Sequence, residues 1–210
     1  MKVLVIGAGN MASAFVKQLR FAQHEVSITT RDPAKAQALA ARHEGAKAIA
    51  LTDAAKDKDV IILATPYTEA ANALSTIGNL KGAVIVDITN PLTPDYMGLT
   101  LGHSSSASEE IAKAAPGAHL VKAFNTLFAQ VLDQGAKLAD GTKASVFFAG
   151  DNEVAKQLVK QLAVSMGFQA IDAGGLKNAR YLEPLAGLNI YFGYGASKGT
   201  GIAPTWVGAV

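Results

Sequence analysis

The sequence predicts an α/β fold with a doubly wound parallel sheet, and three features support this prediction. Short apolar segments typical of buried strands alternate with longer segments whose apolar residues recur at helical spacing. A glycine-rich turn joins the first predicted strand to the first predicted helix. The chain has 210 residues, of which 50% are hydrophobic and 17% are charged, and this composition favours a globular domain over a disordered or coiled-coil chain.

Seven segments are predicted to be strands, and the first, residues 3–6, is a continuous run of β-branched and leucine residues. Such runs are typical of strands that are buried on both faces of a parallel sheet. The segment DVIILA has the strongest strand pattern, and strand-like sequence continues as far as Ile171. The predicted strands cover residues 3–6, 25–30, 47–51, 59–64, 83–88, 119–124 and 145–149.

Five segments between or after these strands have the apolar spacing of helices. In the first, Met11, Phe15 and Leu19 recur on one helical face. The second begins with Asp32 as its predicted N-cap and Pro33 at its first position. The predicted helices cover residues 11–22, 33–42, 67–77, 108–115 and 152–166, and residues 89–107 are predicted to be irregular.

The C-terminal segment differs in composition from the rest of the chain. It is rich in glycine and aromatic residues, with helical spacing over residues 180–194 and a loop-forming sequence from residue 195 onward. A disordered tail is the alternative, but such tails rarely contain many aromatic side chains. We therefore predict an α/β domain over residues 1–173, followed by a short helical and loop lid over residues 174–210, which also forms an oligomer contact.

Composition and charge exclude several classes of function. A net charge of +2 is too small for a nucleic-acid-binding surface, so no nucleic acid partner is expected. The absence of cysteine excludes disulfides, thiolate metal sites and cysteine nucleophiles, and it suits a reducing, cytoplasmic environment. The longest runs without Asp, Glu, Lys or Arg, residues 3–16 and 184–197, are too short to span a bilayer, so no membrane association is expected.

The first turn has the pattern of a phosphate-binding loop. Residues 7–12 read GAGNMA, which is G-x-G-x-x-A between a predicted strand and a predicted helix. Gly7 permits the tight turn, Gly9 lets a pyrophosphate approach the backbone, and the helix N-terminus supplies free N–H donors. The pattern also occurs in ordinary turns, but its position here predicts a Rossmann-type dinucleotide site.

The end of the second predicted strand favours NADP(H) over NAD(H). NAD-binding proteins usually end this strand with an acidic residue that accepts a hydrogen bond from the ribose 2′-hydroxyl. Here Thr30 offers a hydroxyl, Arg31 a guanidinium suited to a 2′-phosphate, and Lys35 a second cation one helical turn later. Asp32 comes one position too late and is expected to cap the helix. An Arg31 without a role is the alternative.

Polar turns follow three consecutive central strands, at the edge where a doubly wound sheet binds ligands. They contain Thr65 and Pro66, then Asn90, then Asn125, and these side chains are expected to contact ribose and carboxamide groups. No catalytic acid, base or nucleophile and no metal site is predicted, because the histidines are scattered and no nucleophile motif is present. His103, in the irregular segment, is expected to be a solvated loop residue. A redox reaction at this edge would need only the positioning of two rings for hydride transfer.

Six segments carry a resemblance to a known family. They read GAGNM, TTRDPAKA, ILATPY, DITNPL, VKAFNTLFA and AGGLKNARYLEPL, in this order. With them the chain resembles the deazaflavin-dependent (coenzyme F420) NADP oxidoreductases, and it is also similar to the NADPH-binding domain of transmembrane metalloreductases. The resemblance implies hydride transfer between NADP(H) and a small-molecule redox acceptor, which is coenzyme F420, FMN or FAD, under a C-terminal lid.

The resemblance also implies roles for residues at three places along the cofactor. The pyrophosphate would contact Ala8, Gly9, Asn10 and Met11; the 2′-phosphate would contact Thr30, Arg31 and Lys35; the nicotinamide end would contact Thr65, Pro66, Ala123 and Asn125. The acceptor is expected between residues 125–128 and residues 180–206, where Arg180 either pairs with an anionic acceptor tail or forms a salt bridge. The apolar C-terminal segment predicts a homodimer.

Two other functions remain open at this stage. GAGNMASAF also resembles the start of pyrroline-5-carboxylate reductase, an imine reductase, but that family needs a helical C-terminal domain of about 100 residues, and too little chain follows Ile171. The second alternative is a regulatory protein that senses NADPH without turnover. Oxidation of NADPH on addition of a flavin or deazaflavin would distinguish an enzyme from such a sensor.

Overall fold

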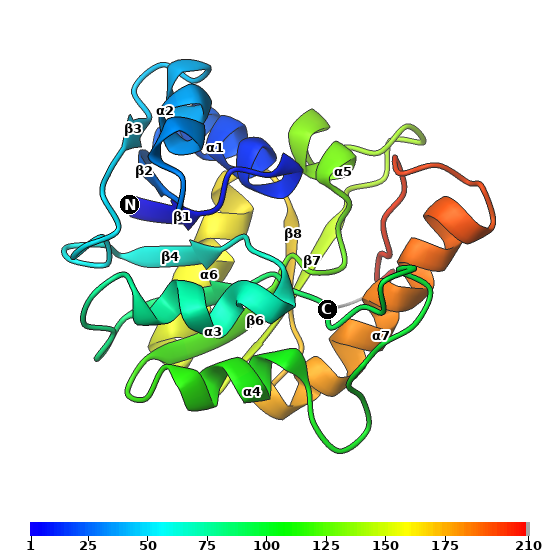
Figure 1. Ribbon diagram of the computed structural model, residues 1–210. Coiled ribbons are helices and arrows are strands. Elements are labelled where there is room, and N and C mark those ends of the chain that lie inside the picture. Colours follow the sequence, from blue (N-terminus) through cyan, green and yellow to red (C-terminus); the bar gives the residue numbers. More distant parts are fainter. Residues whose placement is uncertain (209–210) are drawn as a thin grey trace.

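The protein is built around one eight-stranded sheet (Figure 1). The structure is a computed structural model and describes residues 1–208. The strands are β1 (Lys2–Ile6), β2 (Glu25–Thr29), β3 (Lys47–Ala48), β4 (Val60–Leu63), β5 (Val84–Asp87), β6 (His119–Ala123), β7 (Ser145–Gly150) and β8 (Gln169–Asp172). Their order in the sheet is β3-β2-β1-β4-β5-β6-β7-β8. The first six strands form the two halves of a doubly wound sheet, so the predicted fold class is confirmed.

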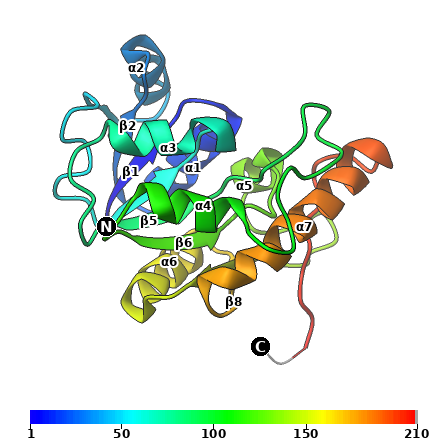
Figure 2. The same ribbon diagram turned by 60° about the horizontal axis from the view of Figure 1, so that its bottom comes forward.

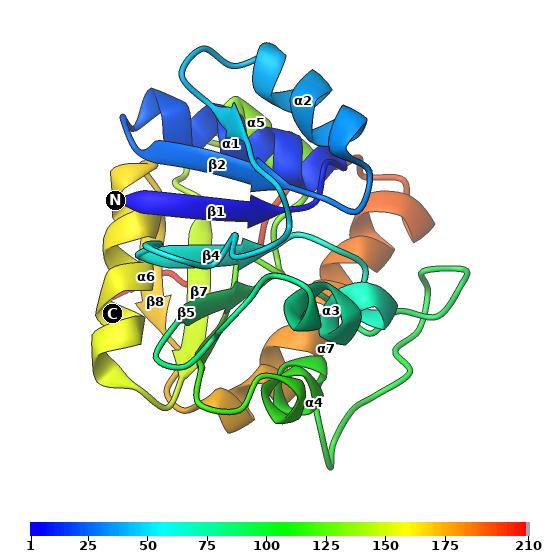
Figure 3. The same ribbon diagram turned by 60° about the vertical axis from the view of Figure 1, so that its left-hand side comes forward.

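The pairing is parallel everywhere except between β6 and β7. Figure 3 shows the arrows of β1, β2 and β4 pointing the same way, so their carboxyl ends lie at one edge of the sheet. The reversal at β7 was not predicted from the sequence, because a strand buried on both faces has the same apolar pattern in either direction.

Helices cover both faces of the sheet. They are α1 (Asn10–Phe21), α2 (Pro33–Ala41), α3 (Tyr67–Ser75), α4 (Ala107–Ala114), α5 (Ala129–Gln134), α6 (Glu153–Ser165) and α7 (Ala179–Ile190). The predicted cap of α2 is confirmed, since the Asp32 carboxylate accepts a hydrogen bond from Ala34 N at 3.1 Å. The short helix α5 was not among the predicted elements, whereas β8 lies where strand-like sequence was expected to continue as far as Ile171. Among the described residues, none of the helices has both the length and the apolar character needed to cross a bilayer.

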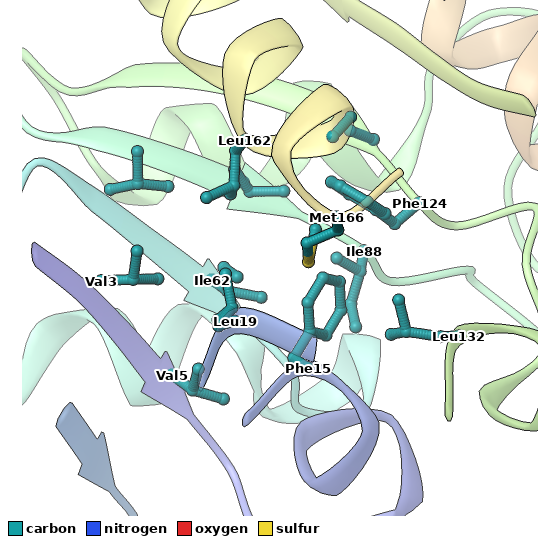
Figure 4. Close-up of a cluster of buried hydrophobic side chains, with 14 of the residues drawn as sticks. Val3, Val5, Phe15, Leu19, Ile62, Ile88, Phe124, Leu132, Leu162 and Met166 are labelled. Atoms are coloured by element: carbon teal, nitrogen blue, oxygen red, sulfur yellow. The ribbon is translucent and has the colours of Figure 1, made fainter. Parts of the chain in front are cut away.

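Successive residues of β1 fill two separate hydrophobic cores, as strand geometry requires. Val3 and Val5 pack with α1, α2 and α6, whereas Leu4 and Ile6 pack with α3 and α4. Figure 4 shows the first core, in which Phe15 of α1 lies near Met166 and Leu132. Because both faces are buried, the carboxyl edge of the sheet is left as the place where a ligand can approach.

The C-terminal segment packs along the β6–β8 part of the sheet and beside α4, as Figure 2 shows. Leu182 of α7 is buried against Phe147 and Ile171. A short π-helix, Tyr191–Gly195, continues α7, and residues 196–208 are irregular, which agrees with the predicted helix and loop. The division of the chain at residue 173 stays a prediction.

Candidate functional site

The turn between β1 and α1 has the geometry of an anion-binding loop. Gly7 has φ +125°, and a Cβ added there would lie 2.3 Å from the Ala64 carbonyl oxygen, so only glycine fits. At Gly9 an added Cβ would meet nothing within 4 Å, so the backbone is open to an approaching group. Gly9 is also the N-cap of α1 and provides no side-chain cap, so the first N–H groups of α1 are free to bind an anion.

The largest cavity at this edge, with a volume of about 670 Å³, lies beyond the carboxyl ends of β1, β2 and β4. Eight predicted site residues line it together: Gly7, Ala8, Gly9, Thr30, Arg31, Lys35, Thr65 and Pro66. Residues from the first two turns of α3 complete its wall, including Glu69 and Asn72. The cavity is large enough for a nucleoside, and we call it the adenosine cavity.

Two smaller cavities lie at the start of α1. Asn10 lines a polar cavity of about 390 Å³, and Met11 lines a cavity of about 220 Å³. The two share Phe128 and Tyr194, so they adjoin each other. Since Gly9, Asn10 and Met11 are consecutive and each lines a different cavity, the N-terminus of α1 lies where the three cavities meet.

The 220 Å³ cavity lies between the segments that follow β5 and β6 and the helix α7, and we call it the lid cavity. It is lined by Met11, Asn90, Tyr96, Asn125, Thr126, Leu127, Phe128, Ala129, Ala186, Asn189, Ile190 and Tyr194. The set includes the predicted residues Met11, Asn90 and Asn125. Ala123 lines none of the described cavities, because its side chain is fully buried in the core.

Two asparagines at the lid cavity fix each other's orientation. Asn90 Nδ2 donates to the Asn125 backbone oxygen at 2.9 Å, and Asn125 Nδ2 donates to Asn90 Oδ1 at 3.0 Å. Asn125 Nδ2 also donates to the Leu182 carbonyl of α7 at 3.0 Å. Both side-chain hydrogen bonds of Asn125 use Nδ2. Its Oδ1 can only accept, and it has no hydrogen-bond partner although the residue is only 5% exposed.

Other buried side-chain oxygens that follow β4, β5 and β6 also lack hydrogen-bond partners. In the part of the chain that the structure describes, they are Thr65 Oγ1, Thr89 Oγ1 and Thr126 Oγ1. Buried polar atoms are normally hydrogen-bonded, and exceptions need an explanation such as a missing ligand or water. Their concentration at one edge of the sheet marks that edge as a polar binding site.

The backbone at Phe124 is strained where the chain leaves β6. Phe124 has φ +60°, which is unfavourable for a bulky side chain. Its ring is fully buried, in edge-to-face contact with Phe15 at 5.0 Å and Phe168 at 6.3 Å between ring centroids. Packing of this ring therefore holds the turn in place, and the next residue along the chain is Asn125. Strained residues of this kind are concentrated at functional sites.

A buried ionic cluster lies beneath the lid helix and was not identified from the sequence. Lys122 Nζ is 2.8 Å from Asp87 Oδ2 and 2.9 Å from Glu183 Oε1, and all three side chains are at most 2% exposed. Glu183 also accepts from the N–H groups of Ala107 and Ser108 at the start of α4. The available signal was that Asp87 and Lys122 are charged residues within apolar strand patterns. Glu183, the second partner of Lys122, lies 61 residues farther along the chain.

Arg180 of α7 is bound within the protein. Its guanidinium makes two hydrogen bonds to Glu109, of 2.8 and 2.7 Å, and these bonds hold the pKa of the Glu109 carboxyl below its ordinary value. Arg180 was expected either to pair with an anionic acceptor tail or to form a salt bridge, and in the structure it forms the salt bridge. His103 lies exposed in the irregular loop, and its carbonyl accepts from Arg180 at 3.2 Å.

Glu69 is a charged residue of the adenosine cavity that the sequence analysis missed. Its Oε2 is 2.9 Å from Arg31 Nη1, so the carboxylate pairs with the residue that is predicted to bind the 2′-phosphate. Thr30 Oγ1 accepts from Asp32 N and donates to Asp32 O, which shapes the turn that presents Arg31. Within residues 1–208, no group of three or more His, Asp or Glu side chains has the geometry to hold a metal ion.

Comparison with known proteins gives consistent results. Residues 2–91 match the family described as NADP oxidoreductase, coenzyme F420-dependent. The chain is 30% identical to the F420-dependent NADP reductase of Methanocaldococcus jannaschii, over 98% of both chains. It is 29% identical to the metalloreductase STEAP3 of Rattus norvegicus, over 88% of this chain but only 36% of that protein.

Solved structures extend the same comparison. A putative F420-dependent NADP-reductase from Arthrobacter sp. FB24 superimposes with a TM-score of 0.84, at 30% identity and over 96% of both chains. An imine reductase from Streptomyces aurantiacus superimposes with a TM-score of 0.67 at 19% identity. This second similarity concerns the fold alone, and the chain covers 64% of that protein.

Proposed function

This chain belongs to the F420-dependent NADP oxidoreductase family, and from that membership we propose that it transfers a hydride between NADP(H) and a deazaflavin acceptor, coenzyme F420. FMN and FAD are the other acceptors to test. In this proposal residues 1–173 bind NADP(H), and residues 174–210 cover the acceptor, in the cytoplasm. The observation that carries it is that three cavities adjoin the start of α1, since the consecutive residues Gly9, Asn10 and Met11 each line a different one.

The residues present fit NADP(H) at its phosphates. The open backbone at Gly9 and the uncapped N-terminus of α1 would hold the pyrophosphate. Thr30, Arg31 and Lys35, all at the same cavity, would hold the 2′-phosphate. When bound, the cofactor supplies the hydride, so the chain has to bind, orient and exclude water.

The lid cavity fits the nicotinamide end. The unpaired Asn125 Oδ1 would accept a hydrogen bond from the carboxamide NH₂ group, which is the only N–H donor of the nicotinamide. Phe128 and Tyr194, in edge-to-face contact at 5.7 Å, provide an apolar wall that excludes water from the reacting carbons. Among the described residues, those that line the cavity include no Asp, Glu, His, Lys or Arg, and Tyr96 and Tyr194 are the titratable groups. This supports a reaction in which positioning, rather than proton transfer by a charged side chain, is the main task.

A turnover screen tests the proposed function. NADPH is mixed with the protein and with F420, FMN or FAD in separate reactions, and oxidation is followed by absorbance. We expect turnover with F420 to exceed that with the flavins. Binding of NADPH without turnover on any of the three acceptors would contradict the proposal and favour the sensor.

The role of Asn125 is tested with a cofactor analogue. In 3-acetylpyridine adenine dinucleotide phosphate a methyl group replaces the carboxamide NH₂ group, so Asn125 has no donor to bind. We expect wild type to bind NADP⁺ about 3–10-fold more tightly than the analogue, and Asn125→Leu to bind both equally, because one hydrogen bond contributes about 0.5–1.5 kcal/mol. Equal binding of the two by wild type would contradict the role.

The outer face of α7 supports a homodimer as the assembly. Tyr181, Leu188 and Tyr191 lie on one side of the helix and are between 51 and 74% exposed. Tyr96 and Met97 of the irregular loop add exposed apolar surface. Exposed patches of this kind usually mark protein contacts. Light scattering should give twice the monomer mass of 21.7 kDa for wild type, and Leu188→Glu should reduce it to the monomer value.

A further inference from the structure

An acidic side chain faces the basic group that is proposed to bind the 2′-phosphate. Glu69 lies in the first turn of α3, whereas Arg31 follows β2, and the two side chains meet at 2.9 Å. Both line the adenosine cavity. The ion pair therefore joins two elements that form the walls of this cavity, at the place where the phosphate would bind.

The pair has little structural purpose. The Arg31 side chain is 68% exposed and that of Glu69 38%, and ion pairs with this exposure contribute little to stability. Asp32, the other acidic residue of the cavity, caps α2 through its contact with Ala34 N. Among the described residues, Glu69 is thus the carboxylate that occupies Arg31.

We propose that Glu69 is a specificity-determining residue that limits the preference of this site for NADP(H) over NAD(H). This inference rests on the proposed function. A bound 2′-phosphate has to share or displace the Glu69 carboxylate on Arg31, and it is repelled by the negative charge of Glu69. NAD(H) has a hydroxyl at the same position, which meets no such repulsion and can donate to Glu69. The acidic residue that usually ends the second strand has that role in NAD-binding proteins.

Calorimetry on the full chain isolates this end of the site. The titrants are adenosine 2′,5′-bisphosphate, which carries the 2′-phosphate, and AMP, which lacks it; neither contains nicotinamide. We expect Glu69→Gln to tighten bisphosphate binding about 3–10-fold and to change AMP binding by less than about twofold, since only the bisphosphate competes with the carboxylate. Full-length NADP⁺ and NAD⁺ should follow the same pattern.

Two further variants complete the test. In an Arg31→Ala background, Glu69→Gln should change bisphosphate binding less than it does in wild type, because there is no guanidinium to compete for. Glu153→Gln is the matched control: Glu153 also lies in the first turn of a helix and pairs with a lysine at 2.8 Å, but it lines none of the described cavities. It should leave both affinities unchanged.

The outcomes separate this inference from the proposed function. If wild type binds NADPH and the bisphosphate but Glu69→Gln binds the bisphosphate equally or more weakly, the role of Glu69 is overturned and the proposed function stands. If wild type binds neither, both are overturned. A denaturation midpoint of Glu69→Gln equal to that of wild type ensures that the affinities refer to folded protein.

Discussion

The two ends of the candidate cofactor site contain ion pairs in opposite environments. At the adenosine cavity, Arg31 and Glu69 form a single pair at the surface. Beneath the lid, Lys122 is fully buried and pairs with two carboxylates, Asp87 and Glu183. Water screens the first pair, so either partner can exchange for a ligand at small cost. The buried cluster has lost its hydration and depends on its internal contacts, so it favours a single position of α7.

This difference in burial suggests different tasks for the two groups of charges, ligand binding for the exposed pair and stability of the fold for the buried cluster. In the proposed function, the charges that would recognise the cofactor are exposed and contribute little to the fold, whereas the charges that hold α7 are buried. Variants at each end should therefore differ both in the size of their effect and in the property that changes.

The largest expected effect is on stability, from the buried cluster. Lys122→Met leaves two carboxylates buried without their cation, and it should lower the free energy of unfolding by about 3–5 kcal/mol. Arg31→Met, the matched change at the exposed pair, should lower it by less than about 1 kcal/mol. Urea denaturation measures both. Similar losses for the two variants would show that burial does not distinguish the two ends.

The next effect is on cofactor choice. Arg31→Ala should weaken NADPH binding by about 10–150-fold, because a charge-assisted hydrogen bond contributes on the order of 1.5–3 kcal/mol. NADH binding should change little, so most of the preference should be lost. Fluorescence titration with both cofactors measures this. Equal affinities of wild type for NADPH and NADH would contradict the prediction at once.

A smaller effect is expected at the lid. A Cβ added at Gly193 would lie 2.5 Å from Phe128 Cζ, so Gly193→Ala should displace the ring that lines the lid cavity. The KM for the acceptor should rise more than the dissociation constant for NADPH, since Phe128 does not line the cavity of Arg31 and Lys35. Gly187→Ala is the control, because an added Cβ there meets Leu99 at an ordinary 3.8 Å. A rise in KM for both variants would contradict a specific role of Phe128.

The smallest effect is a pH dependence at the Arg180–Glu109 pair. Hydrogen bonds from Arg180 lower the pKa of Glu109 in the folded protein, so the pair stabilises the fold above the ordinary glutamate pKa. This stabilisation is lost as pH falls through the lowered pKa of the folded state. The denaturation midpoint of wild type should therefore exceed that of Glu109→Gln at about pH 7, and this difference should be smaller at about pH 2. A constant difference would mean that the Glu109 charge is not what stabilises the pair.

Local features of the site could be predicted from the sequence. The capping role of Asp32 follows from its position directly before Pro33 and a helical pattern, and the structure confirms it. The loop geometry at Gly7 likewise follows from its neighbours along the chain. Both features depend on residues only a few positions apart.

Features that depend on distant partners could not be predicted in this way. Glu69 is 38 positions from Arg31 and has the appearance of an ordinary exposed residue in a first helical turn. The antiparallel direction of β7 and the cluster around Lys122 likewise depend on how separate elements are placed in space. Patterns along a chain indicate which face a residue takes but not which residue it meets there.

The hydrogen bond from Asn125 to α7 ends on a main-chain oxygen, that of Leu182. Any residue that keeps α7 helical supplies the same oxygen at the same place. The outward side chains of the helix are therefore open to redesign, or to drift over evolution, while the amide that faces the lid cavity keeps its direction. Substitutions at exposed positions such as Tyr181 and Leu188 should thus alter the proposed dimer contact without disturbing how the Asn125 amide is held.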